Sequence, residues 1–304
     1  MFSAALRQPK TDTCLEDALA MKPATTHRTI VFSHANSFPA STYSQLFEGW
    51  RAAGYEVHAV DKFGHDPRYP VTTDWPHLVT QLKDFIERQV GHPAYLVGHS
   101  LGGYLSMMAA SRHPHLAQGV VVMDSPVLHG WKSAGLGLAK KLGTMDRVIP
   151  SSRIAAQRTQ EWPSLQAARE HFTGKPKFAA FHPRILGDYL AGGTEPHPNG
   201  QTRRLSFARD IETTIYNTMP HDLLHEFRRH PHQCPLAFIG GTRSRELRAV
   251  GLSGIRQLVA KRLSWIEGTH LYPFEHPDQT VAEVLKWLTA FQTEASTAPA
   301  LAPA

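Results

Sequence analysis

The sequence has 304 residues with a formal net charge of +6, and 41% of them are hydrophobic and 19% charged. These values are typical of a globular protein with a sizeable core, and the length allows one large domain or two small ones. No apolar run approaches the ~20 residues that span a membrane, and residues 1–27 lack the apolar centre of a secretory signal, so we expect a cytoplasmic protein without a membrane span.

The charge pattern and the cysteines exclude further classes. Basic residues are scattered with acids between them and form no stripe with aromatic residues, so nucleic-acid binding is not expected. Cys14 and Cys234 give neither a C-x-x-C pair nor a disulfide framework. No clustered ligand spacing indicates a metal, and we expect neither a metal nor an organic cofactor. The oligomeric state does not follow from the sequence.

Strand-like and helix-like segments alternate along most of the chain. Such alternation predicts an α/β fold with a mostly parallel sheet and helices on both faces. Strands are predicted over 29–33, 55–60, 94–97, 119–123, 236–239 and 263–266, and helices over 43–53, 75–90, 104–111, 254–261 and 279–291.

Residues 127–233 break this rhythm. They contain many prolines and histidines, several short helical patterns and no convincing strand alternation. Because a stretch of this length is too long for a loop in a compact domain, we expect a helical cap there. The expected core comprises 28–126 and 234–294, with poorly ordered tails over 1–27 and 295–304.

The segment Gly98-His99-Ser100-Leu101-Gly102 follows a predicted strand and precedes a predicted helix. Strand, G-x-S-x-G and helix in this order are typical of a nucleophile elbow, where a serine sits on a strained turn with its hydroxyl exposed. Side chains at the two glycines would collide with the neighbouring strand and helix, and the serine backbone is pushed toward a positive φ. We therefore interpret Ser100 as a nucleophile.

A serine hydroxyl needs a base beside it, and the base needs a third group that holds its tautomer. His270 follows the predicted strand over 263–266, which places it at the same sheet edge as the elbow. Among the 19 histidines of the chain, its position makes it the candidate base. His276 precedes a proline and is assigned to the entry of the last helix.

Two residues compete for the role of the acid. Asp124 closes a buried strand at the correct sheet edge, and an acid there is costly unless it is paired. The alternative is Glu246, which follows the strand predicted over 236–239. Asp124 is preferred, although an Asp before Ser-Pro can also simply cap a turn.

Backbone amides must also stabilise the negative charge that develops on the substrate. Leu101 follows the nucleophile and supplies one such amide. The second is expected from the loop after the first strand, where we favour Asn36, with Ser37 or Phe38 as alternatives.

These residues together resemble a capped α/β-hydrolase, and the resemblance spans residues 28–294 with its Gly-Thr-His-x-x-Pro-x-Glu-His-Pro ending. Some haloalkane dehalogenases are similar in the His34 loop and in an acid at the place of Asp124, but they use an aspartate where this chain has Ser100. The resemblance therefore implies a serine hydrolase that cleaves a small or medium-sized ester by acyl transfer. The cap would enclose Ser100, and Phe38 and Trp131 are candidate pocket walls.

Two kinds of alternative remain open. A carbon–carbon bond hydrolase or a thioesterase would use the same residues. A non-catalytic receptor for a small hydrophobic ligand could use the same fold.

Overall fold

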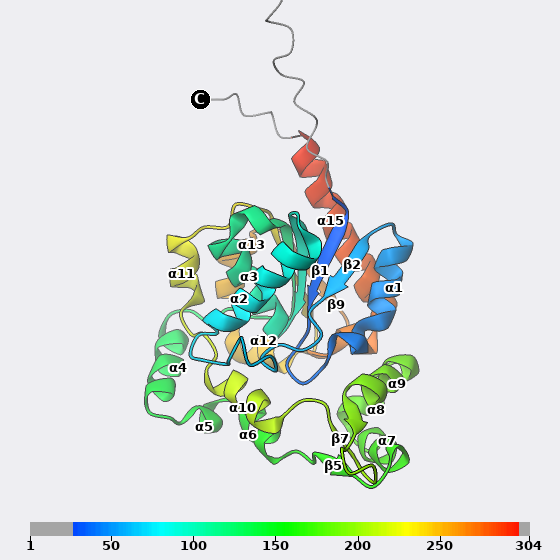
Figure 1. The fold of residues 1–304 in the computed structure, drawn as a ribbon. Coiled ribbons are helices and arrows are strands. Elements are labelled where there is room, and N and C mark those ends of the chain that lie inside the picture. Colours follow the sequence, from blue (N-terminus) through cyan, green and yellow to red (C-terminus); the bar gives the residue numbers. More distant parts are fainter. Residues whose placement is uncertain (1–26, 298–304) are drawn as a thin grey trace, which may run out of the picture.

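The computed structural model describes residues 27–297, and a parallel sheet runs through its centre (Figure 1). The strand order is β2-β1-β3-β4-β8-β9, and every neighbouring pair is parallel. The predicted fold class is thereby confirmed. The strands are β1 (Thr29–Ser33), β2 (Glu56–Ala59), β3 (Ala94–His99), β4 (Ala117–Met123), β8 (Leu236–Gly241) and β9 (Leu263–Ile266).

Both faces of the central strands β1, β3, β4 and β8 are buried, which explains why these strands are apolar at most positions. Ile30 and Phe32 of β1 pack into one hydrophobic cluster, and Val31 between them packs into the other. Helices cover both faces: α1 (Ser44–Ala52) and α15 (Pro277–Thr297) lie on one, and α2 (Pro76–Phe85), α3 (Leu101–Arg112) and α13 (Ser253–Val259) lie on the other.

The predicted helices shift by one or more residues at their ends, and two of them differ most. The helix predicted over 75–90 is divided, because α2 ends at Phe85 and Ile86–Val90 form a π-helical turn. The last helix continues to Thr297, so the first residues of the C-terminal tail expected over 295–304 are helical. Residues 298–304 and the tail expected before residue 27 lie outside the described residues.

A long segment is inserted between β4 and β8, as the break in the sequence rhythm predicts. It is mostly helical, but it also holds a three-stranded antiparallel sheet that the sequence did not indicate. Strands of two or three residues are too short for their alternation to be recognised. The helices are α4 (Trp131–Lys141), α5 (Met145–Val148), α6 (Pro150–Gln157), α7 (Leu165–Thr173), α8 (Pro176–Ala179), α9 (Pro183–Gly192), α10 (Arg209–Asn217) and α11 (Leu223–Arg229), and the strands are β5 (Glu161–Trp162), β6 (Thr194–Pro196) and β7 (Arg203–Leu205).

Most of the inserted segment lies beyond the carboxyl edge of the large sheet (Figure 1). Hydrogen bonds join it to loops at this edge, among them one from Asn36 Nδ2 to the Glu212 carbonyl at 3.0 Å and one from His182 N to the Phe274 carbonyl at 2.8 Å. The loops that follow β1 and β9 are therefore in contact with α10 and the start of α9. Within residues 27–297, no helix is long and apolar enough to cross a membrane.

Candidate active site

Ser100 stands on a strained turn between β3 and α3. Its φ of 54° and ψ of −115° lie in a region that non-glycine residues rarely adopt, as predicted for an elbow. A Cβ at position 98 would overlap the Gly102 carbonyl, and a Cβ at position 102 would overlap the Ser33 carbonyl of β1. The two glycines therefore permit the turn to lie close to both the helix and the neighbouring strand.

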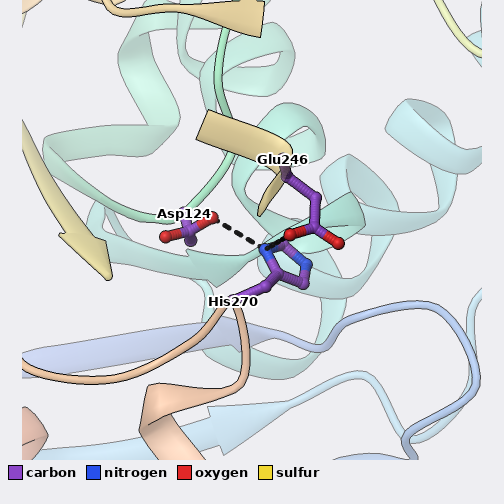
Figure 2. A group of neighbouring side chains, drawn as sticks. All are labelled: Asp124, Glu246 and His270. Carbon is purple, nitrogen blue, oxygen red and sulfur yellow. Dashed lines mark hydrogen bonds and ion pairs between the residues drawn. The ribbon is translucent and has the colours of Figure 1, made fainter. Parts of the chain in front are cut away.

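Asp124 and His270 form a close pair at the same edge (Figure 2). His270 Nδ1 lies 2.7 Å from Asp124 Oδ1, and the carboxylate is completely buried. Ser100 lies beside this pair, because its amide donates to the Met123 carbonyl at 3.0 Å, one residue before Asp124. The Ser100 hydroxyl makes no hydrogen bond to His270 in this structure.

The alternative acid lies near the same imidazole but further away. Glu246, at the start of α12 (Arg245–Val250), has an oxygen 4.0 Å from His270 Nδ1, and its side chain is 45% exposed. A distance of 4.0 Å is too long for a hydrogen bond. The geometry therefore favours Asp124 as the partner of the imidazole, with Glu246 contributing charge from the solvent side.

Two further groups hold the Asp124 carboxylate. The Gly241 amide donates to Oδ2, and the Ser244 hydroxyl donates to Oδ1, each at 2.7 Å. The loop after β8 thereby supplies a hydrogen bond from Ser244 to the acid at the end of the neighbouring strand.

Asp124, Glu246 and His270 each offer a ligand atom within 4.8 Å of the others, which is also the spacing of a small metal site. However, both oxygens of Asp124 already accept hydrogen bonds from Gly241, Ser244 and His270. A carboxylate in this environment is suited to hold an imidazole in one orientation.

The imidazole of His270 is tuned by opposing effects. Burial lowers its pKa, but the hydrogen bond and the negative charge of Asp124 outweigh burial, so that the pKa is raised above 6.5. Glu246 acts in the same direction, and Lys177 acts against it. A base with a raised pKa accepts a proton more readily but is neutral only at higher pH.

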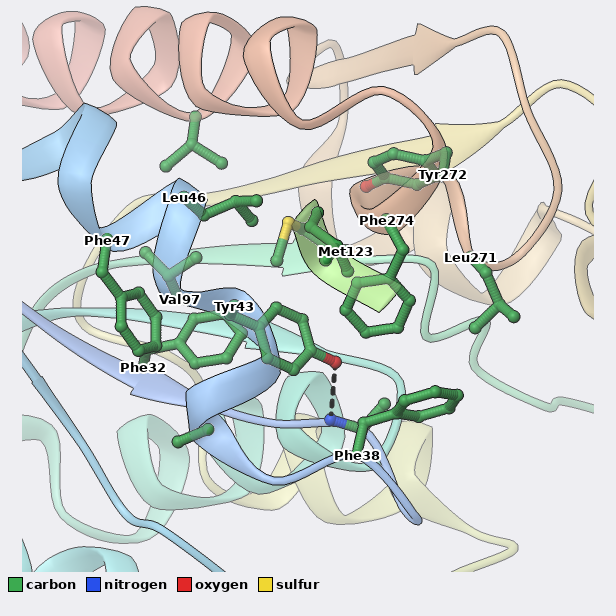
Figure 3. Close-up of a cluster of buried hydrophobic side chains, with 14 of the residues drawn as sticks. Phe32, Phe38, Tyr43, Leu46, Phe47, Val97, Met123, Leu271, Tyr272 and Phe274 are labelled. Carbon is green, nitrogen blue, oxygen red and sulfur yellow. Dashed lines mark hydrogen bonds between the residues drawn. The ribbon is translucent and has the colours of Figure 1, made fainter. Parts of the chain in front are cut away.

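His99, directly before Ser100, joins three loops of the site by hydrogen bonds. Its Nε2 lies 2.9 Å from the His270 carbonyl, and its Nδ1 lies 2.8 Å from the Tyr43 hydroxyl. The same hydroxyl accepts a hydrogen bond from the Ala35 amide at 3.1 Å, which Figure 3 shows among the surrounding aromatic side chains. Tyr43 and His99 are fully buried, and burial lowers the pKa of His99 to about 3. Neither residue was singled out from the sequence.

The two predicted oxyanion donors lie at the same edge. Leu101 is the first residue of α3, and Asn36 lies in the loop after β1. Neither backbone amide donates to an acceptor within the described part of the chain. Ser37, which follows Asn36, has a φ of 76°, so this loop also carries a strained residue.

The two predicted pocket walls have different surroundings. Phe38 is buried, with Phe274 at 4.8 Å and Tyr189 at 5.3 Å between ring centroids (Figure 3). Trp131 is 80% exposed at the start of α4, so the structure does not enclose it as a pocket wall. Trp131 is the first residue of α4, and its indole points to solvent. Its orientation depends on how α4 packs, which could not be predicted from its position in the sequence.

A measurable pocket of about 390 Å³ lies elsewhere, at the amino end of β8. Its walls include Leu224, Phe227, Cys234 and Leu236, and none of the predicted site residues. Because parallel strands gather their functional residues at the carboxyl ends, we do not assign the chemistry to this pocket.

Charged residues of the inserted segment approach the loop after β1. Glu212 of α10 is fully buried, and Arg158 donates to its two oxygens at 3.0 and 3.2 Å and to the Tyr189 hydroxyl at 2.7 Å. Burial raises the pKa of Glu212 despite this pairing. Lys177 of α8 places its Nζ 5.2 Å from the centroid of the Phe38 ring. These residues could not be selected from the sequence, because their approach depends on how the inserted segment folds.

Comparisons with known proteins agree with this architecture. A monoglyceride lipase from Rattus norvegicus is 28% identical over 144 residues, which are 43% of this chain and 46% of the lipase. A pyrethroid hydrolase from Sphingobium wenxiniae is 30% identical over 99 residues, covering 32% and 35% of the two chains. The chain spans less than half the length of the curated relatives it matches.

The likeness in fold is more extensive than the likeness in sequence. The crystal structure of E-2-(acetamidomethylene)succinate hydrolase matches with a TM-score of 0.68 at 19% identity, over 86% of this chain and 91% of that one. A family model described as the alpha/beta hydrolase family matches residues 30–284. Since this match covers most of the sequence, the chain belongs to the α/β-hydrolase family.

Proposed function

We propose that this protein is a serine hydrolase that cleaves the carboxylic ester of a small or medium-sized substrate. The observation that carries the proposal is the 2.7 Å contact between His270 and the buried Asp124, beside a serine on a strained turn. Nucleophile, base and orienting acid at one sheet edge are the groups that acyl transfer requires.

In the proposed reaction, Ser100 Oγ attacks the ester carbonyl while His270 Nε2 takes the hydroxyl proton. Asp124 holds Nδ1–H, so that Nε2 is free to accept this proton. The Leu101 and Asn36 amides receive the oxyanion. His270 then returns the proton to the departing alcohol, and the acyl group stays on Ser100. A water molecule, deprotonated by His270, releases the acid and restores the hydroxyl.

The missing hydrogen bond between Ser100 and His270 does not contradict this mechanism, because such bonds often tighten only when substrate binds. The inserted segment would act as a cap, since it meets the loops around Ser100 through Asn36 and Phe274. Hydrolysis rates on matched esters, thioesters and vinylogous diketones would separate the ester hydrolase from the thioesterase and the carbon–carbon hydrolase.

Replacing Ser100 by alanine should reduce ester hydrolysis by about 10⁶-fold and abolish labelling by a fluorophosphonate probe. The loss follows because no other group would carry the acyl intermediate. Hydrolysis of a p-nitrophenyl ester and probe labelling measure the change, and thermal unfolding checks that the fold remains. Ser106→Ala on the same helix is the matched control, because its buried hydroxyl has no partner in the described chain and should be dispensable. Near-normal turnover by Ser100→Ala would overturn the proposal.

The kcat/KM for a neutral ester should rise with pH through an apparent pKa above 6.5. Only neutral His270 accepts the serine proton, and the Asp124 contact raises the pKa of the imidazole, so activity is gained on the alkaline side. A pH–rate profile in buffers of constant ionic strength measures the inflection. An inflection at or below 6.5 would contradict the described pairing.

Asp124→Asn should lower kcat by about 10⁴-fold, by analogy with the same change in a serine protease, because the amide favours the wrong imidazole tautomer. Glu246→Gln should lower it by less than about tenfold, since Glu246 is 4.0 Å from Nδ1 and 45% exposed. Steady-state kinetics of both isosteric variants make the comparison. Reversal of the two effects would assign the acid to Glu246.

A further inference from the structure

Lys177 places a cation next to the loop that we propose for oxyanion binding. Its Nζ lies 5.2 Å from the ring centroid of Phe38 and 5.8 Å from that of Phe178. Both rings are buried, and Phe38 follows Asn36 by two residues. The ammonium therefore occupies the apolar side of the proposed site, where a positive charge would meet the substrate.

The ammonium has no oxygen partner within residues 27–297, as neither a hydrogen bond nor an ion pair joins Nζ to any acceptor there. Arg158, the neighbouring cation, is in contrast fully engaged by Glu212 and Tyr189. Lys177 is an exposed residue, so a ligand can reach it. Two aromatic faces attract a cation, but they leave its three N–H donors free.

The charges around Lys177 nearly balance. Desolvation is the main reason that its pKa falls to about 8, followed by the positive charge of Arg158, and Lys175 acts in the same direction. Glu246 and Glu212 oppose the fall, but Arg158 already neutralises Glu212. A ligand with one negative charge would neutralise the Lys177 ammonium. The second charge of a doubly negative ligand would have no such partner and would be repelled by Glu246.

We propose that Lys177 binds a carboxylate of the substrate, so that the preferred ester is a half-ester of a dicarboxylic acid. This inference rests on the proposed ester hydrolysis and gives it a substrate class. The apolar rings of Phe38 and Phe178 would contact the methylene chain between the two carbonyl carbons. A charge-assisted hydrogen bond in a partly desolvated place is among the stronger polar contacts, and it would select for the anionic chain end.

The test compares two series of methyl esters of equal acyl length. Monomethyl glutarate, adipate and pimelate carry a terminal carboxylate, and methyl valerate, hexanoate and heptanoate carry a methyl group instead. Lys177→Met should lower kcat/KM for the best half-ester by about 10- to 100-fold and change its neutral counterpart by less than about threefold. Lys175→Met, which removes the neighbouring lysine above Phe172, is the matched control and should alter neither series selectively.

The pH dependence gives an independent readout. The ratio of the two kcat/KM values cancels the titration of His270, so it should fall as the pH rises through about 8, where Lys177 loses its proton. Lys177→Arg should keep the preference and move this fall to higher pH.

Failure of this inference is distinguishable from failure of the proposed function. Equal rates on both series, unchanged in Lys177→Met, would overturn the carboxylate site while leaving ester hydrolysis intact. If no ester is hydrolysed, binding of glutaramate and valeramide measured by calorimetry decides instead. Glutaramate binding weakened about tenfold or more in Lys177→Met supports the site, and glutaramate binding no tighter than valeramide binding overturns it.

A second inference comes from the hydrogen bonds of His99, which do not involve Lys177. The His270 carbonyl can only accept, so His99 Nε2 carries the proton and donates to it. Nδ1 must then accept from the Tyr43 hydroxyl, whose oxygen still accepts from the Ala35 amide. One arrangement of protons thus gives every group in this series of hydrogen bonds a partner.

We infer that Tyr43 and His99 are positioning residues, which hold the base loop, the nucleophile strand and the oxyanion loop in one fixed relation. This inference also rests on the proposed function. A misplacement of about 1 Å can reduce a rate by about 10²-fold even when binding is preserved. Loss of the hydrogen bonds made by Tyr43 and His99 should therefore affect kcat more than KM.

Tyr43→Phe should lower kcat about 10- to 100-fold and change KM less than about threefold. Tyr55→Phe is the matched control, because the Tyr55 hydroxyl is also hydrogen-bonded, to Gln292 at 3.0 Å, in a buried side chain far from the loops. Equal kcat values for the two variants would refute the role. If Tyr43→Phe does not fold, His99→Gln, which keeps a donor at the Nε2 position, should retain more kcat than His99→Met, and equal values would again refute it.

Discussion

The structure around the candidate site depends on a single buried carboxylate. Asp124 is completely removed from solvent, and a buried charge is tolerated only where donors surround it. Its donors come from the ends of two other strands: the Gly241 amide and the Ser244 hydroxyl from the end of β8 and the turn after it, and His270 from the loop after β9. The acid thereby fixes the relative positions of three strand ends.

The backbone at the carboxyl edge of the sheet is strained at two residues, and neighbouring groups must hold these residues in their conformations. Ser100 and Asp124 follow neighbouring strands, and both have positive φ values, 54° and 50°. Residues in such conformations persist only where the surroundings determine them strongly. At Ser100 the glycines make room for the turn, and at Asp124 the hydrogen bonds fix the carboxylate. The two strained turns bring a hydroxyl and a carboxylate toward the same imidazole.

The core of the fold was predictable because it depends on local patterns. The strand predicted over 263–266 has the bounds that the structure gives to β9, since Leu263, Trp265 and Ile266 stand between polar and glycine-containing segments. The helix over 75–90 was recognised from its periodicity, but its π-helical end was not, because the same spacing fits both forms closely. The strands β5, β6 and β7 escaped prediction, since strands of two or three residues show no recognisable alternation and β5 pairs with a strand far along the chain.

The residues of the candidate site also divide into those that local patterns predict and those that depend on packing. Ser100, His270 and Asp124 could be selected because the elbow motif and the ends of predicted strands place them at one edge. The distances from His270 Nδ1, 2.7 Å to Asp124 and 4.0 Å to Glu246, could not be predicted, because both acids follow strands that end at that edge. Trp131 was expected as a wall and is exposed, whereas Arg158, Lys177 and Glu212 were not considered. Their positions depend on the packing of the inserted segment, which has no strong periodicity.

The inserted segment is joined to the loop after β1 through Glu212, the acid of a buried ion pair with Arg158. Glu212 would be unstable in the interior without Arg158, and the carbonyl of the same residue accepts from the Asn36 side chain. Movement of α10 away from the sheet would therefore remove a hydrogen bond from the loop whose amide we propose as an oxyanion donor. A cap held in this way would shape the substrate pocket and also preserve the geometry on which transition-state stabilisation depends. The ion pair of the inserted segment and the carboxylate of the core would thus both act on Ser100, one through the loop that we propose for oxyanion binding and the other through the proposed base.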